Sequence, residues 1–438
     1  MTKQENDDNR HRPNVPPLRF RGFTAPWQRK PLGELADFNP FNKPLEEAFY
    51  YIDLESVEQG RLTEKKKIDR ECAPSRAQRT LNDDDILFQT VRPYQKNHYL
   101  FKSDKSSCQW VASTGYALLR PNVDPTYLYS LIGSESINKE VMIRCTGTAY
   151  PAIRAEELAD IETLHTLSLA EQEKIGTFFR ALDELIAARE EELEKLRQMK
   201  AALLEAMFPN DATVERERER ERERERVTSA TAHTLYDSLL DHTLQAWDIV
   251  PSETSTSHTP RLRFRGFTDP WQRMALKDIC SIKTGELDAN AMAEDGVYPF
   301  FTCAKQTYKT DTYAFSGEAV LIAGNGEVGL TKYYNGKFNA YQRTYVLQSS
   351  RNDIVLRFIL NHIEYGLPKR IAPLLFGSAM PYITINTLDD MPIYIPSLAE
   401  QKQIGAFFRS QDEGIATATE QIDKLKRIKQ ACLKQMFV

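Results

Sequence analysis

The clearest chemical spacing in the chain is Gly324-Asn-Gly-Glu-Val-Gly329, in which glycines recur in the pattern G-x-G-x-x-G after a strand-like run. Such a loop binds a dinucleotide when a helix follows it, because the helix N-terminus then meets the pyrophosphate. Residues 330–338, which follow here, are instead typical of a strand and a turn. We therefore reject a cofactor site and predict a tight turn that exposes Asn325.

A second set of residues could in principle hold a metal ion. Asp53 with Glu64-Lys65-Lys66 contains the residue types with which nucleases hold Mg²⁺ at a scissile phosphate, although this spacing is common by chance. Asn39-Pro-Phe-Asn42 is similar to the Asn-Pro-Pro-aromatic motif of DNA amino-methyltransferases, but the second proline is missing and no glycine-rich cofactor loop precedes it. A nuclease that uses Asp53 and Glu64 therefore remains only a third interpretation of the chain.

Most other classes of catalytic or metal site find no support in the composition. The six cysteines are scattered without a C-x-x-C pair, and the seven histidines show no ligand spacing. No P-loop and no nucleophilic serine elbow are present. We predict that the chain is not an enzyme and binds neither a metal ion nor a cofactor.

The cysteine usage also favours a reducing compartment, since no disulfide framework is indicated. No run approaches the ~18 apolar residues of a membrane span, and the N-terminus lacks the apolar core of a signal peptide. These features predict a cytoplasmic protein.

Polar and aromatic residues near predicted turns are the positive indication of nucleic-acid binding. Arg and Lys suit guanine edges, Asn and Gln suit adenine, and Ser or Thr suit several bases. Because the net charge is −5, any DNA-binding face must arise from local clustering of such residues. The candidates are Lys65, Lys66, Lys67, Arg92, Tyr94, Lys96, Asn97, His98, Thr114, Thr148, Tyr150, Lys305, Gln306, Tyr308, Lys309, Asn325, Arg343, Thr344, Ser378 and Tyr382.

The elements that must position these residues are duplicated. Leu18-Arg-Phe-Arg-Gly-Phe-Thr-Ala-Pro-Trp-Gln-Arg29 returns, with one change, over residues 262–273. Ser168-Leu-Ala-Glu-Gln172 returns as 397–401, each time before a long helical pattern that ends in Met-Phe. A duplicated frame with divergent segments between its marks predicts two different surfaces on one repeated architecture.

The two divergent segments show the same mixture of short strands and turns, so we predict an α+β fold for both. Strand-like runs lie at 48–53, 85–91 and 116–119 in the first segment and at 319–323, 344–348 and 391–395 in the second. Gly147-Thr-Ala-Tyr-Pro-Ala-Ile153 parallels Gly377-Ser-Ala-Met-Pro-Tyr-Ile383. The segments are therefore predicted to be one fold with different side chains on its surface.

The long helical patterns carry apolar seams over about five heptads, which is typical of a coiled coil. A helix of ~39 residues is about 58 Å long and cannot bury such a seam alone, so we expect the two copies to pair antiparallel. Ser168 and Ser397, with a glutamate three residues later, have the spacing of a capping box. The seam residues are Ile175, Phe179, Leu182, Ile186, Leu193, Leu196, Leu203, Ile404, Phe408, Ile415, Ile422 and Leu425. Lys200 and Lys429 interrupt the seams, where they could open to a partner or extend along the surface.

These patterns divide the chain into six segments. An alternating Glu-Arg run over 215–226 places like charges four residues apart and has no apolar face, which predicts an extended linker. The predicted segments are a disordered tail at 1–16, a first domain at 17–165, a long helix at 166–209, a linker at 210–258, a second domain at 259–396 and a second long helix at 397–438.

Taken together, the repeated Leu-Arg-Phe-x-Gly-Phe segment, the Ser-Leu-Ala-Glu-Gln helix start and the Gly-(Thr/Ser)-Ala-x-Pro-x-Ile turn resemble the specificity subunit of type I restriction–modification systems. The resemblance covers nearly the whole chain. It implies two target-recognition domains separated by two long antiparallel helices, related by a pseudo-two-fold axis. Each domain would bind one half of a split, asymmetric DNA target. The Glu-Arg run is not a feature associated with the family.

The resemblance also implies partners. Two adenine-methyltransferase subunits would dock on this chain, and ATP-driven restriction subunits would join through them. S-adenosylmethionine, ATP and Mg²⁺ would bind to those subunits and not to this chain. The alternative from a different class is a non-enzymatic coiled-coil adaptor whose two domains bind proteins, which the negative net charge favours.

Overall fold

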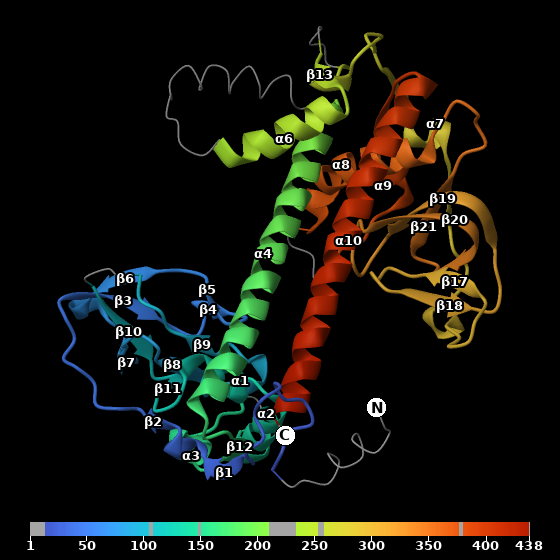
Figure 1. The fold of residues 1–438 in the computed structure, drawn as a ribbon. Helices are drawn as coiled ribbons and strands as arrows, with labels where there is room; N and C mark the ends of the chain where they lie inside the picture. Colours follow the sequence, from blue (N-terminus) through green and yellow to red (C-terminus); the bar gives the residue numbers. More distant parts are fainter. Residues whose placement is uncertain are drawn as a thin grey trace. The chain divides into compact units, whose positions relative to one another are not determined.

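A computed structural model of the chain describes residues 14–104, 108–147, 150–209, 234–252, 258–375 and 380–437. The chain divides into two compact units: unit 1 is Met1–Glu191 with Glu420–Val438, and unit 2 is Glu192–Thr419. Each unit therefore contains one domain and parts of both long helices (Figure 1). Most of the predicted N-terminal tail and the whole Glu-Arg run lie outside the described residues.

Unit 1 contains two four-stranded sheets, with strand orders β6-β3-β10-β7 and β2-β11-β8-β9. Its strands are β1 (Gln28–Pro31), β2 (Ala36–Phe38), β3 (Ala48–Ile52), β4 (Val57–Glu58), β5 (Arg61–Leu62), β6 (Lys66–Asp69), β7 (Ala77–Thr80), β8 (Ile86–Gln89), β9 (Tyr99–Leu100), β10 (Gln109–Ser113), β11 (Tyr116–Pro121) and β12 (Glu162–His165). Its short helices are η2 (Leu32–Glu34), η3 (Arg70–Cys72), η4 (Pro93–Gln95), α1 (Pro125–Ile132), α2 (Glu135–Arg144) and α3 (Ala155–Ala159).

The core of unit 1 follows from short apolar strands and capped helices. All four residues of β8 are buried, and β8 pairs with β11 in the centre of its sheet. Asp124 caps α1 by accepting a hydrogen bond from the Tyr127 amide at 2.8 Å, and Pro125 stands at the first helical position. Helix α1 packs into the same apolar cluster as Trp27.

Unit 2 is built around one six-stranded sheet of order β16-β21-β19-β20-β17-β18. Its elements are α6 (Thr234–Ala246), β13 (Ile249–Pro251), β14 (Leu262–Phe264), β15 (Gln272–Ala275), α7 (Leu276–Ile279), β16 (Ser281–Thr284), η5 (Ala289–Ala291), β17 (Tyr298–Phe301), β18 (Thr307–Thr310), β19 (Phe315–Ala323), β20 (Thr331–Ala340), β21 (Thr344–Gln348), α8 (Leu356–Leu375), α9 (Ile385–Asp389) and β22 (Pro392–Ile395). Strand β20 follows the glycine-rich loop directly, as expected for a turn and not for a dinucleotide site.

The long helices are α4 (Leu169–Met207) and α10 (Leu398–Met436), each of 39 residues. In unit 1, the Phe179 ring near the start of α4 lies 6.0 Å from the Phe437 ring just beyond the end of α10. In unit 2, the relation is reversed: Phe208, just after α4, lies 6.0 Å from Phe408 near the start of α10. Within each unit the helices therefore run antiparallel, and the predicted α+β fold with a helix pair is confirmed (Figure 1).

The predicted seam residues lie in the interior of this helix pair or against the domain cores. Leu182, Leu196, Ile415 and Leu425 are half-buried, and the other eight are buried. Ile175 and Phe179 belong to the apolar core of unit 1, whereas Leu203, Ile404 and Phe408 belong to that of unit 2. No helix in the described part of the chain has a stretch that is apolar and long enough to span a membrane.

Part of the predicted linker at 210–258 is ordered secondary structure. Helix α6 and strand β13 lie within it, and β13 pairs antiparallel with β14. The reason is apolar burial: Leu240, Leu244 and Trp247 pack against the core of unit 2. The linker prediction is thus wrong for 234–251.

Candidate nucleic-acid interface

In unit 1, three chain segments meet at the end of β8. The Thr90 amide donates a hydrogen bond to the Gly115 carbonyl at 3.1 Å, and the Ile153 amide donates to the Thr90 carbonyl at 3.1 Å. Segments 90–98, 113–116 and 150–153 thus form what we call the loop corner of unit 1. Residues 150–153, the end of the Gly-(Thr/Ser)-Ala-x-Pro-x-Ile motif, close this corner.

Unit 2 builds the same arrangement from different residues. The Gly324 amide, at the end of β19, donates to the Arg343 carbonyl at 2.9 Å, and the Ile383 amide donates to the Gly324 carbonyl at 2.8 Å. Segments 324–329, 341–345 and 380–384 form the loop corner of unit 2. The Tyr345 hydroxyl strengthens it by donating to the Ile383 carbonyl at 2.8 Å.

The loop corner of unit 1 brings together residues that are far apart in the sequence. The Arg92 guanidinium carbon lies 4.5 Å from the centroid of the Tyr150 ring. The side chains of Tyr94 and Tyr150 are exposed by 50% and 64%. Lys96 is exposed in the same loop. These side chains offer an exposed surface with cationic and aromatic character, which suits a nucleic acid.

His98 lies in the interior, which corrects its selection as a candidate DNA contact. Its ring is stacked at 4.0 Å on Phe88, and its Nδ1 accepts a hydrogen bond from the Gln89 amide at 3.1 Å. Burial lowers the pKa of His98 to about 3. The ring therefore stays neutral and holds the loop, and it cannot reach a base.

Asn97 and Thr114 lie at the corner but are half-buried. The Asn97 side-chain oxygen accepts a hydrogen bond from the Gln59 amide at 3.0 Å, which ties the loop to the turn between β4 and β5. The Thr114 amide donates to the Arg76 carbonyl at 2.9 Å. Thr148 lies outside the described residues.

The lysine run at 65–67 is not part of this corner, because it lies at edge strand β6 of the other sheet. Lys65 pairs with Asp104 at 2.9 Å and Lys66 pairs with Asp53 at 3.0 Å, while Lys67 is exposed. Two of the three charges are thus directed toward carboxylates of the same unit.

The Asp53 carboxylate, which was considered for metal binding, accepts hydrogen bonds within its own turn. One Asp53 oxygen accepts hydrogen bonds from the Ser56 amide at 2.9 Å and the Ser56 hydroxyl at 2.7 Å. Burial raises the pKa of Asp53, but the hydrogen bonds from Ser56 and Lys66 outweigh it and lower the pKa overall. Among the described residues, no group of three His, Cys, Asp or Glu side chains is placed to hold a metal ion.

At the loop corner of unit 2, Asn325 is half-buried, whereas Arg343 and Tyr382 are exposed. A neighbouring loop with Lys305 and Gln306 is attached to it, since the Lys305 amide donates to a Glu327 side-chain oxygen at 3.0 Å. The structure thus gathers these five candidate residues around one edge of unit 2.

Lys332 fixes the shape of that neighbouring loop, a role that no sequence pattern indicated. Its ammonium donates to the carbonyls of Ala304 at 2.9 Å and Lys305 at 2.7 Å. Burial lowers the pKa of Lys332. An amphipathic strand offers no pattern from which a contact across 27 residues could have been predicted.

Three other candidates of unit 2 lie elsewhere. Thr344 is 1% exposed beside Cys303, so its selection as a DNA contact is corrected: the hydroxyl packs inside the corner. Tyr308 and Lys309 lie on the edge strand β18 and not in the loops of the corner. Ser378 lies outside the described residues.

The duplicated frame meets in the same way in both units. Arg19 donates two hydrogen bonds to the Glu171 carboxylate, at 2.6 and 2.8 Å. Arg263 makes the matching pair with Glu400, at 2.9 and 2.7 Å. Sequence reasoning missed both pairs, although the repeat of an arginine in one motif and a glutamate in the other was a usable signal.

These pairs also correct the predicted capping boxes. The Ser168 and Ser397 hydroxyls do accept a hydrogen bond from the amide three residues later, at 3.4 Å each. The glutamates, however, do not return to the serine amides, because their carboxylates bind the arginines instead. The helix starts are thereby fixed to the Leu-Arg-Phe segments.

The lysines in the helix seams form ion pairs within their own unit. Lys200 of α4 pairs with Glu364 of α8 at 2.8 Å and with Asp412 of α10. Lys429 of α10 pairs with Asp183 of α4. Each lysine thus links the two helices at one register, which is a known use of polar residues in a coiled-coil seam.

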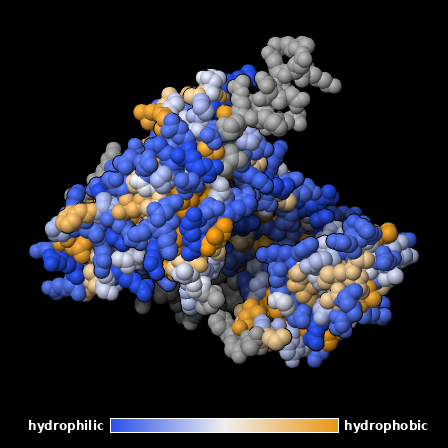
Figure 2. Space-filling model, turned by 90° about the horizontal axis from the view of Figure 1, so that it is seen from below, coloured by the Kyte–Doolittle hydropathy of each residue, from blue (hydrophilic) through white to orange (hydrophobic). Residues whose placement is uncertain are grey.

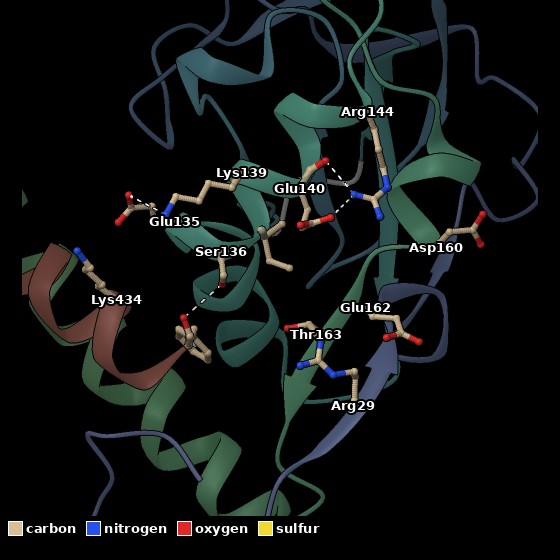
Figure 3. Close-up of a pocket in the computed structure, with 12 residues that line it drawn as sticks. Arg29, Glu135, Ser136, Lys139, Glu140, Arg144, Asp160, Glu162, Thr163 and Lys434 are labelled. Carbon is tan, nitrogen blue, oxygen red and sulfur yellow. Dashed lines mark hydrogen bonds and ion pairs between the residues drawn. The ribbon is translucent and has the colours of Figure 1, made fainter. Parts of the chain in front are cut away.

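A charged cleft of about 660 Å³ in unit 1 lies between α2, strands β1 and β12, and the end of α10 (Figure 3). It is lined by Arg29, Lys139, Arg144 and Lys434 and by Glu135, Glu140, Asp160 and Glu162. The Arg144–Glu140 and Lys139–Glu135 pairs neutralise one another. The cleft therefore lacks the excess positive charge that phosphates require.

The surface view supports a hydrophilic exterior. Figure 2 shows one face on which hydrophilic residues predominate and apolar residues form small groups.

Comparison with known proteins identifies the family that this architecture resembles. Residues 268–427 match the family model described as type I restriction modification DNA specificity domain. The EcoDI specificity subunit of Escherichia coli is 40% identical over 167 residues, which cover 37% of this chain and 37% of that relative. The MjaIX specificity subunit of Methanocaldococcus jannaschii is 21% identical over 71% of this chain and 67% of its own length.

One solved structure shares the fold over almost the whole chain. The S subunit of a type I restriction–modification system from M. genitalium superposes with a TM-score of 0.60 at 16% sequence identity. The match covers 97% of this chain and 99% of that one. At this identity the solved structure shows a shared fold alone. The expected resemblance to the family is confirmed by the family model over residues 268–427 and by the EcoDI match, and this chain spans 37% of the length of that relative.

Proposed function

We propose, from the premise that the chain belongs to the family of type I restriction–modification specificity subunits, that it is a sequence-specific DNA-binding subunit. Each loop corner contacts one half of a bipartite target. The observation that carries this proposal is that both units build the same corner from the same backbone contacts but expose different side chains. Unlike side chains on like scaffolds predict unlike half-sites.

The long helices set the gap between the half-sites in this proposal. A helix of 39 residues is about 58 Å long, comparable to one and a half turns of B-DNA at roughly 34–36 Å per turn. Inserting one heptad into both α4 and α10 lengthens the preferred gap and leaves both half-sites unchanged. An unchanged gap would contradict the role of the helices as a spacer.

The chain itself performs no catalysis in this proposal. It docks two adenine-methyltransferase subunits, and restriction subunits join through them in the cytoplasm, where foreign DNA is encountered. S-adenosylmethionine, ATP and Mg²⁺ bind to those partners. With a net charge of −5, this chain supplies few phosphate contacts, so we expect weak binding alone and tight binding in the complex.

The test is a gel shift of the chain with its methyltransferase subunits over a range of salt, followed by methylome sequencing to identify the target. A steep loss of binding with salt and an asymmetric methylated motif support the proposal. Deleting residues 275–396 removes the preference at one half-site only. Salt-independent binding of protein partners, with no methylated motif, would instead support an adaptor.

A further inference from the structure

Arg92 is a half-buried cation of the loop corner of unit 1, and its surroundings hold it in one conformation. Its backbone is left-handed, with φ at 54°, a conformation that non-glycine residues keep only when the surroundings enforce it. The enforcing contacts are present. The Arg92 amide donates to the Pro151 carbonyl at 2.8 Å, and the Tyr150 ring supports the guanidinium from one face.

The loop that carries Arg92 is braced from beneath by a buried side chain. Gln89, 2% exposed, donates from its amide nitrogen to the Gln95 side-chain oxygen at 2.9 Å. Its own side-chain oxygen accepts from the Asn97 amide at 3.1 Å. Gln89 therefore holds the C-terminal end of the short helix η4, and the hydrogen bond from Arg92 to Pro151 holds its start. A loop that is fixed before any ligand arrives lowers the entropic cost of binding.

The guanidinium of Arg92 has N–H donors that are available to a ligand. Arg120 of the same unit, by contrast, donates two hydrogen bonds to the Asp85 carboxylate, at 2.9 and 2.8 Å. Within the described ranges, the Arg92 side chain has only the stacking contact with Tyr150. A guanidinium carries five N–H donors in a fixed plane, and stacking on a ring leaves the edge of that plane open.

We propose that Arg92 recognises a guanine in the half-site of unit 1, and that Tyr150 holds the guanidinium plane in the orientation this requires. Arginine donates two parallel hydrogen bonds to guanine O6 and N7 in the major groove. The same fork also binds phosphates, so the dependence of binding on sequence separates a base contact from a phosphate contact. This inference rests on the proposed function.

The experiment uses the complex with its methyltransferase subunits and duplexes that carry the target found by methylome sequencing. Arg92→Lys keeps the charge and loses the fork, so affinity falls about tenfold to a hundredfold for the target with guanine. Replacing that guanine by 7-deazaguanine removes N7 and weakens the parent protein, but it adds little to Arg92→Lys. Tyr150→Ala has a partial effect at the same base pair, whereas Tyr150→Phe keeps the ring and binds normally.

Arg70→Lys is the matched control, because Arg70 is exposed on η3 of the same unit and away from the corner. It is expected to change affinity less than about twofold. If Arg92→Lys instead leaves binding intact, or if Arg92→Ala weakens all sequences equally and lowers the salt dependence, Arg92 contacts phosphate and the inference is wrong. If the parent complex prefers no sequence at all, the proposed function fails, and this inference with it.

Discussion

The two units agree in their frame and differ in their loop corners. Arg19–Glu171 and Arg263–Glu400 form the same two-bond contact, and Trp27 and Trp271 are both buried beside a Met-Phe helix end. At the corners, by contrast, unit 1 presents a stacked arginine and unit 2 presents a glycine-rich turn. The frame is constrained by dense packing, whereas exposed loop side chains are free to vary without loss of the fold.

The largest expected difference between the two frames arises when one partner of the buried arginine–glutamate pair is removed. Glu400→Ala leaves the Arg263 guanidinium, 3% exposed, without its carboxylate, and we expect a loss of about 3–5 kcal/mol in the free energy of unfolding. Glu171→Ala is expected to cost less, because Arg19 is 9% exposed and lies nearer to water. Urea denaturation measures both losses.

The double variant Arg263→Met with Glu400→Leu is the control for Glu400→Ala. Because it removes both charges together, it should recover most of the lost stability. Equal losses in the single and double variants would show that the pair acts through packing and not through charge.

Acid should weaken the two units at different places. Burial lowers the pKa of His98 to about 3 and that of His362 to about 4, and each ring accepts a backbone hydrogen bond, from Gln89 and Tyr394 respectively. As pH falls below 6.5, these histidines become protonated in the unfolded chain but stay neutral in the folded protein. The free energy of unfolding therefore decreases progressively. By pH 5 we expect a loss of about 2 kcal/mol per histidine.

The measurement is the shift of the urea midpoint between pH 7 and pH 5. In His98→Asn the amide oxygen replaces Nδ1 as acceptor, and in His362→Gln it replaces Nε2, so each variant should lose part of the acid sensitivity. A parent protein with the same stability at both pH values would contradict the prediction.

Close helix contacts differ between the units at equivalent glycines. A Cβ on Gly176 of α4 would lie 2.1 Å from the Thr126 hydroxyl and 2.7 Å from the Tyr127 amide nitrogen, whereas one on Gly405 of α10 would lie 3.3 Å from Arg357. Gly176→Ala should therefore cost about 1–2 kcal/mol despite the better helix propensity of alanine. Gly405→Ala should be near neutral, and thermal unfolding of both variants would reveal equal effects if the close approach were unimportant.

The smallest expected difference concerns the seam lysines. The Lys200 side chain is 14% exposed and binds two carboxylates, while that of Lys429 is 30% exposed and binds Asp183. We expect Lys200→Met to cost about 1 kcal/mol and Lys429→Met about half of that, because solvent screens the more exposed pair. Raising the salt concentration should reduce the difference between the two variants in the free energy of unfolding. A larger difference at high salt would contradict this explanation.

The duplicated plan was predictable from the amino-acid sequence alone. Repeated motifs, alternating apolar runs and heptad seams predicted two α+β segments, two long helices and their antiparallel pairing, because these patterns act locally or repeat along the chain. The strand at 344–348 and the long helices from 169 and 398 lie where the pattern indicated. The strand pattern after Gly329, where a dinucleotide site would need a helix, likewise excluded a dinucleotide loop, and strand β20 lies there.

Which polar residues are exposed and which hold the fold depends on contacts between distant segments of the chain. His98 and Tyr94 are close in the sequence, and both have aromatic rings with a polar atom. His98 is nevertheless buried as a hydrogen-bond acceptor, whereas Tyr94 is 50% exposed. The partners of Arg19, Arg92 and Lys332 come from segments that are distant along the chain. Side-chain chemistry sets what a residue can bind, but burial and long-range contacts set whether it is free to do so, and no local pattern encodes them.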